Sequence, residues 1–120
     1  MYESPHLLML SFYFLNKILI LKMEDKVDLL QYNQIYIFFL NNMGVSYYNK
    51  KNLVEAEYYF KRALEINPNY INALNNLGNL KKDLDLVDEA KNFYIKSIKL
   101  NDNVTETHFN LGILYQESGD

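Results

Sequence analysis

Asparagine recurs in this sequence at a spacing of 34 residues, as Asn42, Asn76 and Asn110. An amide side chain carries both a hydrogen-bond donor and an acceptor, so a ladder of amides can hold the backbone of an extended polypeptide without reading its side chains. Each bond would contribute about 1 kcal/mol net. Asparagine is a mediocre helix former, and a helix face that met only water would be better served by Glu, Lys or Gln. One alternative is that the three asparagines reflect an asparagine-rich composition. Another is that repeat duplication copied them without giving them a role in binding.

Five further asparagines are predicted to lie on the same helix face as these three, and they extend the candidate binding site. They are Asn41, Asn49, Asn72, Asn75 and Asn79. We therefore expect a protein or peptide segment as the partner.

Residue clusters that could support other chemistry are absent from the sequence. There is no Cys, which excludes thiolate metal sites and cysteine nucleophiles, and His6 and His108 are the only histidines. The carboxylates Asp83, Asp85, Asp88 and Glu89 gather where one predicted helix ends and the next begins, and there Asp85 is expected to cap the second helix in preference to binding calcium. No phosphate-binding glycine loop or G-x-S-x-G motif occurs. The chain is thus predicted to be no enzyme and to use no metal, cofactor or small-molecule substrate.

Composition bounds the architecture. With 120 residues, 49% of them hydrophobic, the chain has enough apolar material for one small domain with a core. The net charge is -3 and the Lys residues are scattered among Asp and Glu, which argues against nucleic-acid binding. Four Gly and two Pro residues are too few for a turn-rich β-architecture, so the chain is predicted to be helical.

The 34-residue spacing extends to the elements that must position the amides. Gly44, Gly78 and Gly112 recur at it, each after an apolar residue. Apolar residues around each glycine follow the i, i+3, i+4, i+7 pattern of a helix face. Because glycine within a helix costs about 1 kcal/mol relative to alanine, its recurrence indicates that a second helix packs closely against it. Small residues at Ala56, Ala63 and Ala90 serve the same approach, and Asn67-Pro68 ends the second helix.

This pattern resembles the tetratricopeptide repeat, which implies an all-α, right-handed solenoid of antiparallel helix pairs. The matching positions are Leu40, Met43, Gly44, Tyr47, Ala56, Phe60, Ala63 and Pro68 in the first copy, Leu74, Leu77, Gly78, Ala90 and Tyr94 in the second, and His108, Leu111, Gly112 and Tyr115 in the third. The second copy departs from the pattern at Lys81 and Asp102. The predicted organisation is a poorly matching helical segment over 1–36, repeats over 37–70 and 71–104, and the first helix of a third repeat over 105–120.

The resemblance implies a scaffold or adaptor that binds an extended polypeptide in the concave groove of the repeats. In character it is similar to the repeat region of O-GlcNAc transferase, where an asparagine ladder lies at the matching position, so a repeat fragment of such a glycosyltransferase is the alternative. Other family members bind a terminal carboxylate with groove cations. Here the corresponding positions are Asn41, Val45, Glu106 and Asn110, and Glu106 and Glu117 would repel a carboxylate.

The apolar stretch Leu7–Leu21 is the only candidate for membrane association. It is shorter than a spanning helix and is interrupted by Asn16 and Lys17. It also lacks the basic start of a signal peptide. We expect it to pack on the repeats of a cytoplasmic protein, with a membrane-tethered adaptor as the alternative. The following segment, Glu24–Tyr32, is predicted to form a short amphipathic helix with Val27, Leu30 and Leu29 inward.

The third copy carries a packing face without the second helix that covers it in the other copies. His108, Leu111 and Tyr115 are expected on that face. An uncapped terminal repeat is marginal. The sequence is therefore predicted either to be a fragment or truncated gene model, or to pair through this helix with another copy of itself or with another protein.

Overall fold

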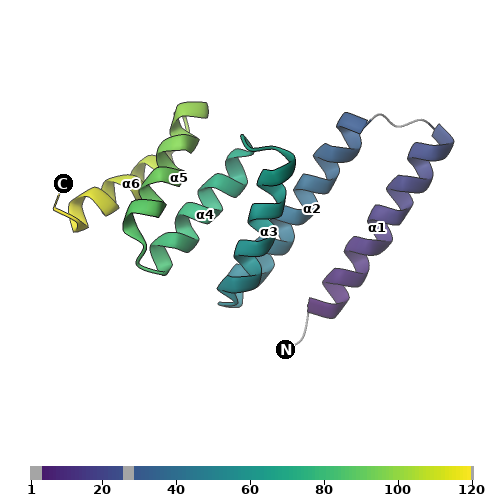
Figure 1. The fold of residues 1–120 in the computed structure, drawn as a ribbon, viewed down its shortest axis with the longest axis horizontal. Helices are drawn as coiled ribbons and strands as arrows, with labels where there is room; N and C mark the ends of the chain where they lie inside the picture. The colour runs from purple at the N-terminus through teal and green to yellow at the C-terminus, as the bar shows by residue number, and fades with distance from the viewer. Residues whose placement is uncertain (1–3, 26–28, 120) are drawn as a thin grey trace. The chain divides into compact units, whose positions relative to one another are not determined.

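The computed structural model describes residues 4–25 and 29–119, and these form six α-helices and no β-strand. The all-α prediction is confirmed. The chain divides into two compact units, unit 1 (Met1–Ile66) and unit 2 (Asn67–Asp120). The helices are α1 (Ser4–Asp25), α2 (Leu29–Asn49), α3 (Leu53–Ile66), α4 (Ile71–Asp83), α5 (Val87–Leu100) and α6 (Thr105–Glu117) (Figure 1).

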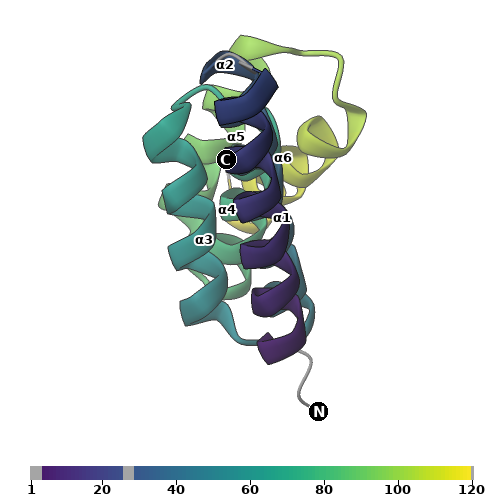
Figure 2. The same ribbon diagram turned by 90° about the vertical axis from the view of Figure 1, so that its right-hand side faces the viewer.

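In unit 1, helix α2 packs against α1 on one side and α3 on another (Figures 1 and 2). The predicted packing face of α2 is buried, including Leu40 and Met43. Helix α3 meets it with Ala56, Phe60 and Ala63, all fully buried. The ring of Phe60 lies so close to Gly44 that a Cβ atom there would be 2.4 Å from it. The glycine is thus required by the close helix approach that the spacing predicted.

Helix α1 packs on α2 through one narrow stripe. Leu8, Ser11 and Leu15 are half-buried on that stripe, whereas Met9 and Phe12 are among the many exposed apolar residues of the helix. The prediction that Leu7–Leu21 packs on the following helices is therefore confirmed for only part of its surface. Among the described helices, none has the length and apolar content needed to span a bilayer.

The boundary between α1 and α2 differs from the prediction. No separate short helix covers Glu24–Tyr32, because α1 extends to Asp25 and α2 begins at Leu29. Leu29 and Leu30, predicted to point inward, are exposed. Val27 lies outside the described residues. The charged stretch Glu24–Asp28 contains no Gly or Pro to mark where one helix ends and the next begins.

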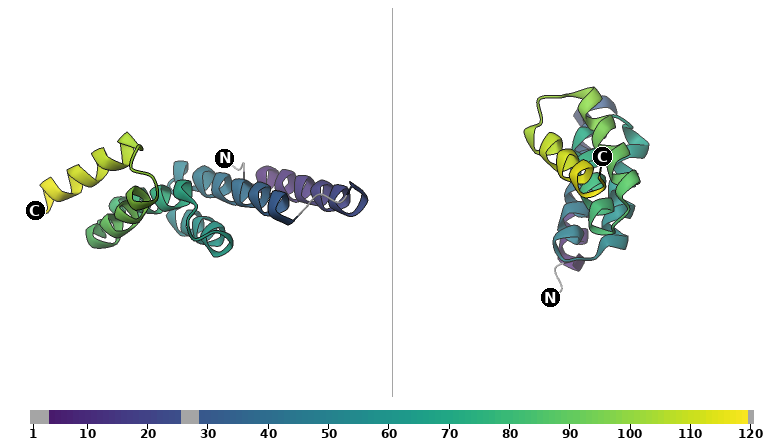
Figure 3. Two further views of the ribbon diagram at one scale, coloured as in Figure 1. Left: turned by 90° about the horizontal axis from the view of Figure 1, so that it is seen from above. Right: turned by 90° about the vertical axis from the view of Figure 1, so that its left-hand side faces the viewer.

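In unit 2, α4 and α5 form an antiparallel pair, and α6 packs against α5 (Figures 1 and 3). Leu74 and Leu77 of α4 are buried, and Tyr94 of α5 is fully buried over Gly78, where a Cβ would lie 2.4 Å from the ring. The second copy therefore repeats the glycine contact of unit 1 with a tyrosine in place of the phenylalanine.

The helix-ending turns repeat with the same period. Lys51, Asp85 and Gly119 all have left-handed φ angles, of 66°, 62° and 81°, and stand 34 residues apart. This conformation is natural for the residue that follows a helix, but it favours glycine. Asp85 does not cap α5 as predicted, because it occupies this turn and the N-cap position is Leu86 without a side-chain bond.

The turns that follow the second helices also match. The Asn67 Oδ1 atom accepts a bond of 3.0 Å from the backbone N–H of Asn69, and Asn101 accepts the same bond of 3.0 Å from Asn103. These asparagine turns end α3 and α5 as predicted for Asn67-Pro68. Asp102 replaces the proline without changing the turn.

Candidate functional site

The amides of α2 divide between the surface and the interior of unit 1. Asn42 and Asn49 are exposed, and their separation of seven residues places them on one side of the helix. Asn41 does not belong to this surface, because it is only 5% exposed. It shares a stripe with the buried residues Ile37 and Gly44. Its assignment to the binding face was wrong, since one residue along a helix is a turn of about 100°.

In unit 2, the amides of α4 form a continuous stripe. Asn72, Asn76 and Asn79 follow one another at i, i+4 and i+7, with Asn72 exposed and the other two half-buried. Asp83 continues the stripe and is exposed. Helix α4 thus presents three amides and a carboxylate along one line.

Two hydrogen bonds join this helix to α6. The Thr107 hydroxyl donates to Asn75 Oδ1 at 2.8 Å, and Asn110 Nδ2 donates to Asn79 Oδ1 at 3.2 Å. The bond occupies one of the two Nδ2 hydrogens of Asn110, a residue of the ladder. Asn75, Asn79 and Asn110 therefore hold the two helices in register, whatever else they bind.

The hydroxyl of Tyr94 is a polar group of this site that the sequence did not indicate. It donates a hydrogen bond to Asn79, although the rest of the residue is buried. Burial raises the pKa of Tyr94 far above its usual value, and the carboxylates of Asp83 and Glu106 raise it further. The neutral hydroxyl is thus maintained as a donor. Asn79 consequently accepts from two donors, one on α5 and one on α6.

The hydrogen bond between Tyr94 and Asn79 could have been found by comparing the two copies of the repeat. The counterparts of Tyr94 and Asn79, 34 residues earlier, are Phe60 and Val45. An apolar pair in the first copy is replaced by a hydrogen-bonded pair in the second. Had the two positions been compared together, the exchange of both residues would have predicted that they touch.

Most of the packing face predicted for the third copy is exposed. His108, placed on that face from the sequence, is exposed, with Nε2 2.9 Å from the backbone oxygen of Asp102. Gly112 is exposed, Leu111 is half-buried and Tyr115 retains 37% exposure. No described helix covers these positions in the way that α3 covers α2. The buried side of α6 carries Thr107 and Leu114 instead.

The acidic corner between α4 and α5 is structural. Lys81, which stands where the repeat pattern has tyrosine, is only 7% exposed, and its ammonium lies 3.2 Å from the Glu89 carboxylate. The lysine stem thus fills the tyrosine position while its charge is paired at the surface. Within the described residues, no three potential metal ligands lie together.

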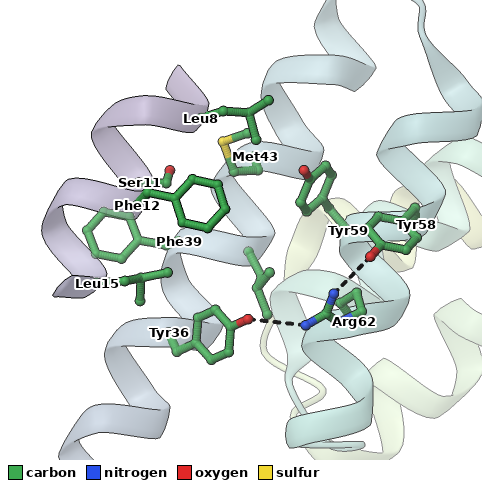
Figure 4. A pocket seen from close by; sticks show the side chains of 11 residues that line it. Leu8, Ser11, Phe12, Leu15, Tyr36, Phe39, Met43, Tyr58, Tyr59 and Arg62 are labelled. Atoms are coloured by element: carbon green, nitrogen blue, oxygen red, sulfur yellow. Dashed lines mark hydrogen bonds between the residues drawn. The ribbon is translucent and has the colours of Figure 1, made fainter. Parts of the chain in front are cut away.

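Unit 1 also contains an aromatic pocket between α1, α2 and α3 (Figure 4). Its volume is about 200 Å³, it is open to solvent, and Phe12, Phe39 and Met43 line it. Arg62 donates to the Tyr58 hydroxyl at 2.9 Å and to the Tyr36 hydroxyl at 3.1 Å. These bonds orient the guanidinium across one end of the pocket and connect α2 with α3.

Comparisons with known proteins agree with this arrangement. Two family models described as tetratricopeptide repeat match residues 37–70 and 59–92. No curated protein sequence matches significantly. Among solved structures, the first TPR of Spaghetti (RPAP3) bound to the HSP90 peptide SRMEEVD aligns with a TM-score of 0.68 and 19% identity, over 93% of each chain.

Two further solved structures give the same result. The first TPR domain of human RPAP3 aligns with a TM-score of 0.65 and 21% identity, over 93% of this chain and 92% of that one. The Sgt2 TPR domain from Aspergillus fumigatus aligns at 0.65 and 20%, over 99% and 81%. None of these three is O-GlcNAc transferase, so that closer resemblance stays a prediction. Six helices with a 34-residue period, the family models and the shared fold together identify the chain as a tetratricopeptide repeat protein.

Proposed function

We propose that the amide face of α4, in unit 2, binds an extended segment of a partner protein through its backbone, and that the amide face of α2, in unit 1, binds backbone in the same way. The observation that carries the proposal is the stripe of Asn72, Asn76 and Asn79 on α4, matched on α2 by the exposed amides of Asn42 and Asn49. Amides spaced by one helical turn offer alternating donors and acceptors to a peptide chain. Such a surface needs no charge and catalyses nothing.

The ladder residues do not all contribute in the same way. Asn42 is exposed and available as a direct contact. Asn110 donates to Asn79, so it positions α6 relative to α4 as well as lying at the site. A variant of Asn110 would therefore combine loss of a ligand contact with loss of helix register. Asn42 is therefore a better probe of binding than Asn110.

The charges of the face select the class of peptide. The similar structure of Spaghetti holds the acidic peptide SRMEEVD. In this chain, Asn41 is buried and Glu106 is exposed at positions where a carboxylate clamp would need accessible cations or amides. Asp83 and Glu117 add exposed negative charge in unit 2. We infer that the partner segment is neutral or basic, because an acidic carboxyl terminus would be repelled.

Fluorescence anisotropy with short capped peptides tests this function. Labelled neutral, basic and acidic peptides, together with SRMEEVD that keeps a free terminal carboxylate, are titrated with the chain and with Asn42→Ala and Asn76→Ala variants. Each substitution is expected to weaken binding of the neutral or basic peptides about fivefold, which corresponds to one net hydrogen bond.

The matched control is Asn92→Ala, because Asn92 is an exposed asparagine on α5, away from the proposed face. The Asn92→Ala variant should bind the neutral or basic peptides with the affinity of the parent chain. Equal affinities for the Asn42→Ala and Asn76→Ala variants would contradict the proposed face. Tight binding of SRMEEVD would contradict the proposed charge selection.

A further inference from the structure

The aromatic pocket of unit 1 is a cavity that the proposed function does not use. Neither Asn42 nor Asn49 lines it, and its walls come from α1, α2 and α3, three helices of one unit (Figure 4). Among the eleven described residues that line it, Arg62 alone is charged. We call this cavity, with the guanidinium across one end, the Arg62 pocket.

Most of the residues that line the Arg62 pocket are apolar or aromatic, and two of its rings are held by contacts outside it. The Phe39 ring stacks on Phe14 with centroids 5.7 Å apart and planes at 17°. The Tyr59 ring stacks on Tyr47 with centroids 5.6 Å apart and planes at 5°. Because these walls are already ordered, an apolar group that enters the pocket pays little to organise them.

The polar end of the pocket is built from hydrogen-bond donors. Arg62 donates to the hydroxyls of Tyr36 and Tyr58, as the dashed lines in Figure 4 show. Within the described residues, neither hydroxyl donates a hydrogen bond of its own. A guanidinium has five N–H groups, and these two bonds leave one hydrogen on each terminal nitrogen. Donors that lack acceptors favour an anionic ligand.

The positive charge of Arg62 is only weakly compensated. The Glu65 carboxylate lies 3.7 Å from Nε, and its side chain is 72% exposed. Water screens an exposed pair of this kind. One guanidinium balances one negative charge, and Glu65 together with the exposed Glu55 of α3 would repel a second. The pocket therefore favours a monoanion over a phosphate monoester, which carries close to two charges.

The volume of the pocket limits the size of the ligand. An apolar cavity of about 150 Å³ holds one benzene ring. The Arg62 pocket, at about 200 Å³, has room for one such ring or a short hydrocarbon chain together with a small polar group. This corresponds to about ten non-hydrogen atoms.

We propose that the Arg62 pocket binds a small monocarboxylic acid whose body is a single aromatic ring or a short hydrocarbon chain. The carboxylate accepts hydrogen bonds from Arg62, Tyr36 and Tyr58. The hydrocarbon body lies against Phe39 and Met43, away from the polar end. The acid is a bound ligand, and the proposal includes no reaction.

Nuclear magnetic resonance titration of the isotope-labelled full chain with phenylacetate tests this site. Phenylacetate matches the pocket in size and charge, and phenylacetamide has the same shape without the charge. We expect saturable shifts at residues of α1, α2 and α3, with a dissociation constant of about 1 mM or below. Phenylacetamide should bind at least about tenfold more weakly. Equal binding of acid and amide, or no saturable shifts up to about 10 mM, would overturn the proposal.

Arg62→Gln removes the cation and should weaken phenylacetate binding about tenfold or more. The matched control is Lys61→Gln, which makes the same change of charge one residue away. Lys61 does not line the pocket and pairs with Glu57 at 2.8 Å. The control should bind phenylacetate as the parent chain does. Undiminished binding by Arg62→Gln would overturn the proposal.

Phe12→Ala is a second variant, needed because Arg62→Gln also removes the bond to Tyr36 that connects α3 with α2. Phe12 lines the pocket but is 65% exposed, so its removal should leave the fold intact by circular dichroism. We expect it to weaken phenylacetate binding about threefold. The neighbouring Tyr13, 56% exposed and outside the pocket lining, provides the control Tyr13→Ala. Equal affinities of these two variants would place the ligand elsewhere and overturn the proposal.

Two further titrations distinguish other occupants of the Arg62 pocket. Ethylbenzene that binds as tightly as phenylacetate would overturn the preference for an anion. A peptide with a carboxy-terminal phenylalanine that binds at the same residues at least about tenfold more tightly would overturn the choice of a small molecule in favour of a protein chain end. Neither result concerns Asn42 or Asn76, so this proposal and the proposed function fail independently.

Discussion

Alanine should lower the stability of the chain at two of the three repeated glycines, Gly44 and Gly78, and raise it at the third, Gly112. A Cβ at Gly78 would lie 2.4, 2.6 and 3.0 Å from three atoms of the Tyr94 ring, and one at Gly44 would lie at the same distances from Phe60. A Cβ at Gly112 meets no described atom within 4 Å. The same substitution thus overpacks two sites and only removes backbone freedom at the third.

The magnitudes follow from two opposing terms. Overpacking a close contact costs about 1–3 kcal/mol, whereas alanine gains about 1 kcal/mol over glycine within a helix. We expect Gly44→Ala to destabilise by about 1 kcal/mol and Gly112→Ala to stabilise by about 0.5–1 kcal/mol. Gly78→Ala should cost about 0.5–1 kcal/mol more than Gly44→Ala, because the Tyr94 ring cannot retreat without straining its bond to Asn79.

Urea unfolding followed by far-ultraviolet circular dichroism measures these differences. Because repeat proteins can unfold in parts, amide hydrogen exchange should locate the loss at Gly78→Ala to α4 and α5. A Gly78→Ala chain as stable as the parent would refute the account of close packing. So would a Gly112→Ala chain destabilised as much as the other two.

Three further predictions concern stability. The exchange Tyr94→Phe with Asn79→Val recreates the apolar pair of the first copy, so the double variant should be more stable, by about 1 kcal/mol, than the sum of the single changes predicts in urea unfolding. Strict additivity would refute the pairing. Lys51→Gly and Asp85→Gly relieve left-handed backbone and should each raise the free energy of unfolding in urea by about 0.5–1 kcal/mol. A lower free energy of unfolding for either variant would contradict the left-handed turns. The folded-state pKa of Tyr94 is raised, so its stabilising effect is full below the unfolded value of about 10 and is lost as pH rises above it, by at most about 1.4 kcal/mol per pH unit. Thermal unfolding from pH 9 upward should show this decline reduced in Tyr94→Phe, and an unchanged decline would refute it.

Much of the fold could be predicted because its signals are local and repeat. The 34-residue spacing of Gly44 and Gly78 predicted that a second helix packs closely against each glycine, and the structure places an aromatic ring on each. The Asn67 turn was readable because an asparagine side chain bonds to backbone only two residues away. The asparagine turn depends on a neighbour two residues away, and the contact of each glycine with the following helix could be inferred because the glycine recurs with the repeat.

The parts that could not be predicted depend on other helices. His108 fits the repeat pattern, but its burial would require a covering helix that the described residues lack, and nothing in the residue itself reveals this. Asn41 and Asn42 have the same chemistry, and only the direction of packing separates a buried amide from an exposed one. The bond between Tyr94 and Asn79 depends on the side-chain directions of two helices together.

Backbone recognition by the amide faces is tested most directly by changing the peptide and leaving the protein intact. A neutral or basic peptide that binds in the anisotropy titration is compared with an analogue N-methylated at alternate residues and with a peptide of scrambled sequence. The amide ladder predicts that N-methylation weakens binding at least about tenfold, because it removes backbone donors, while scrambling changes it little. Binding that survives N-methylation but is lost on scrambling would contradict the central claim.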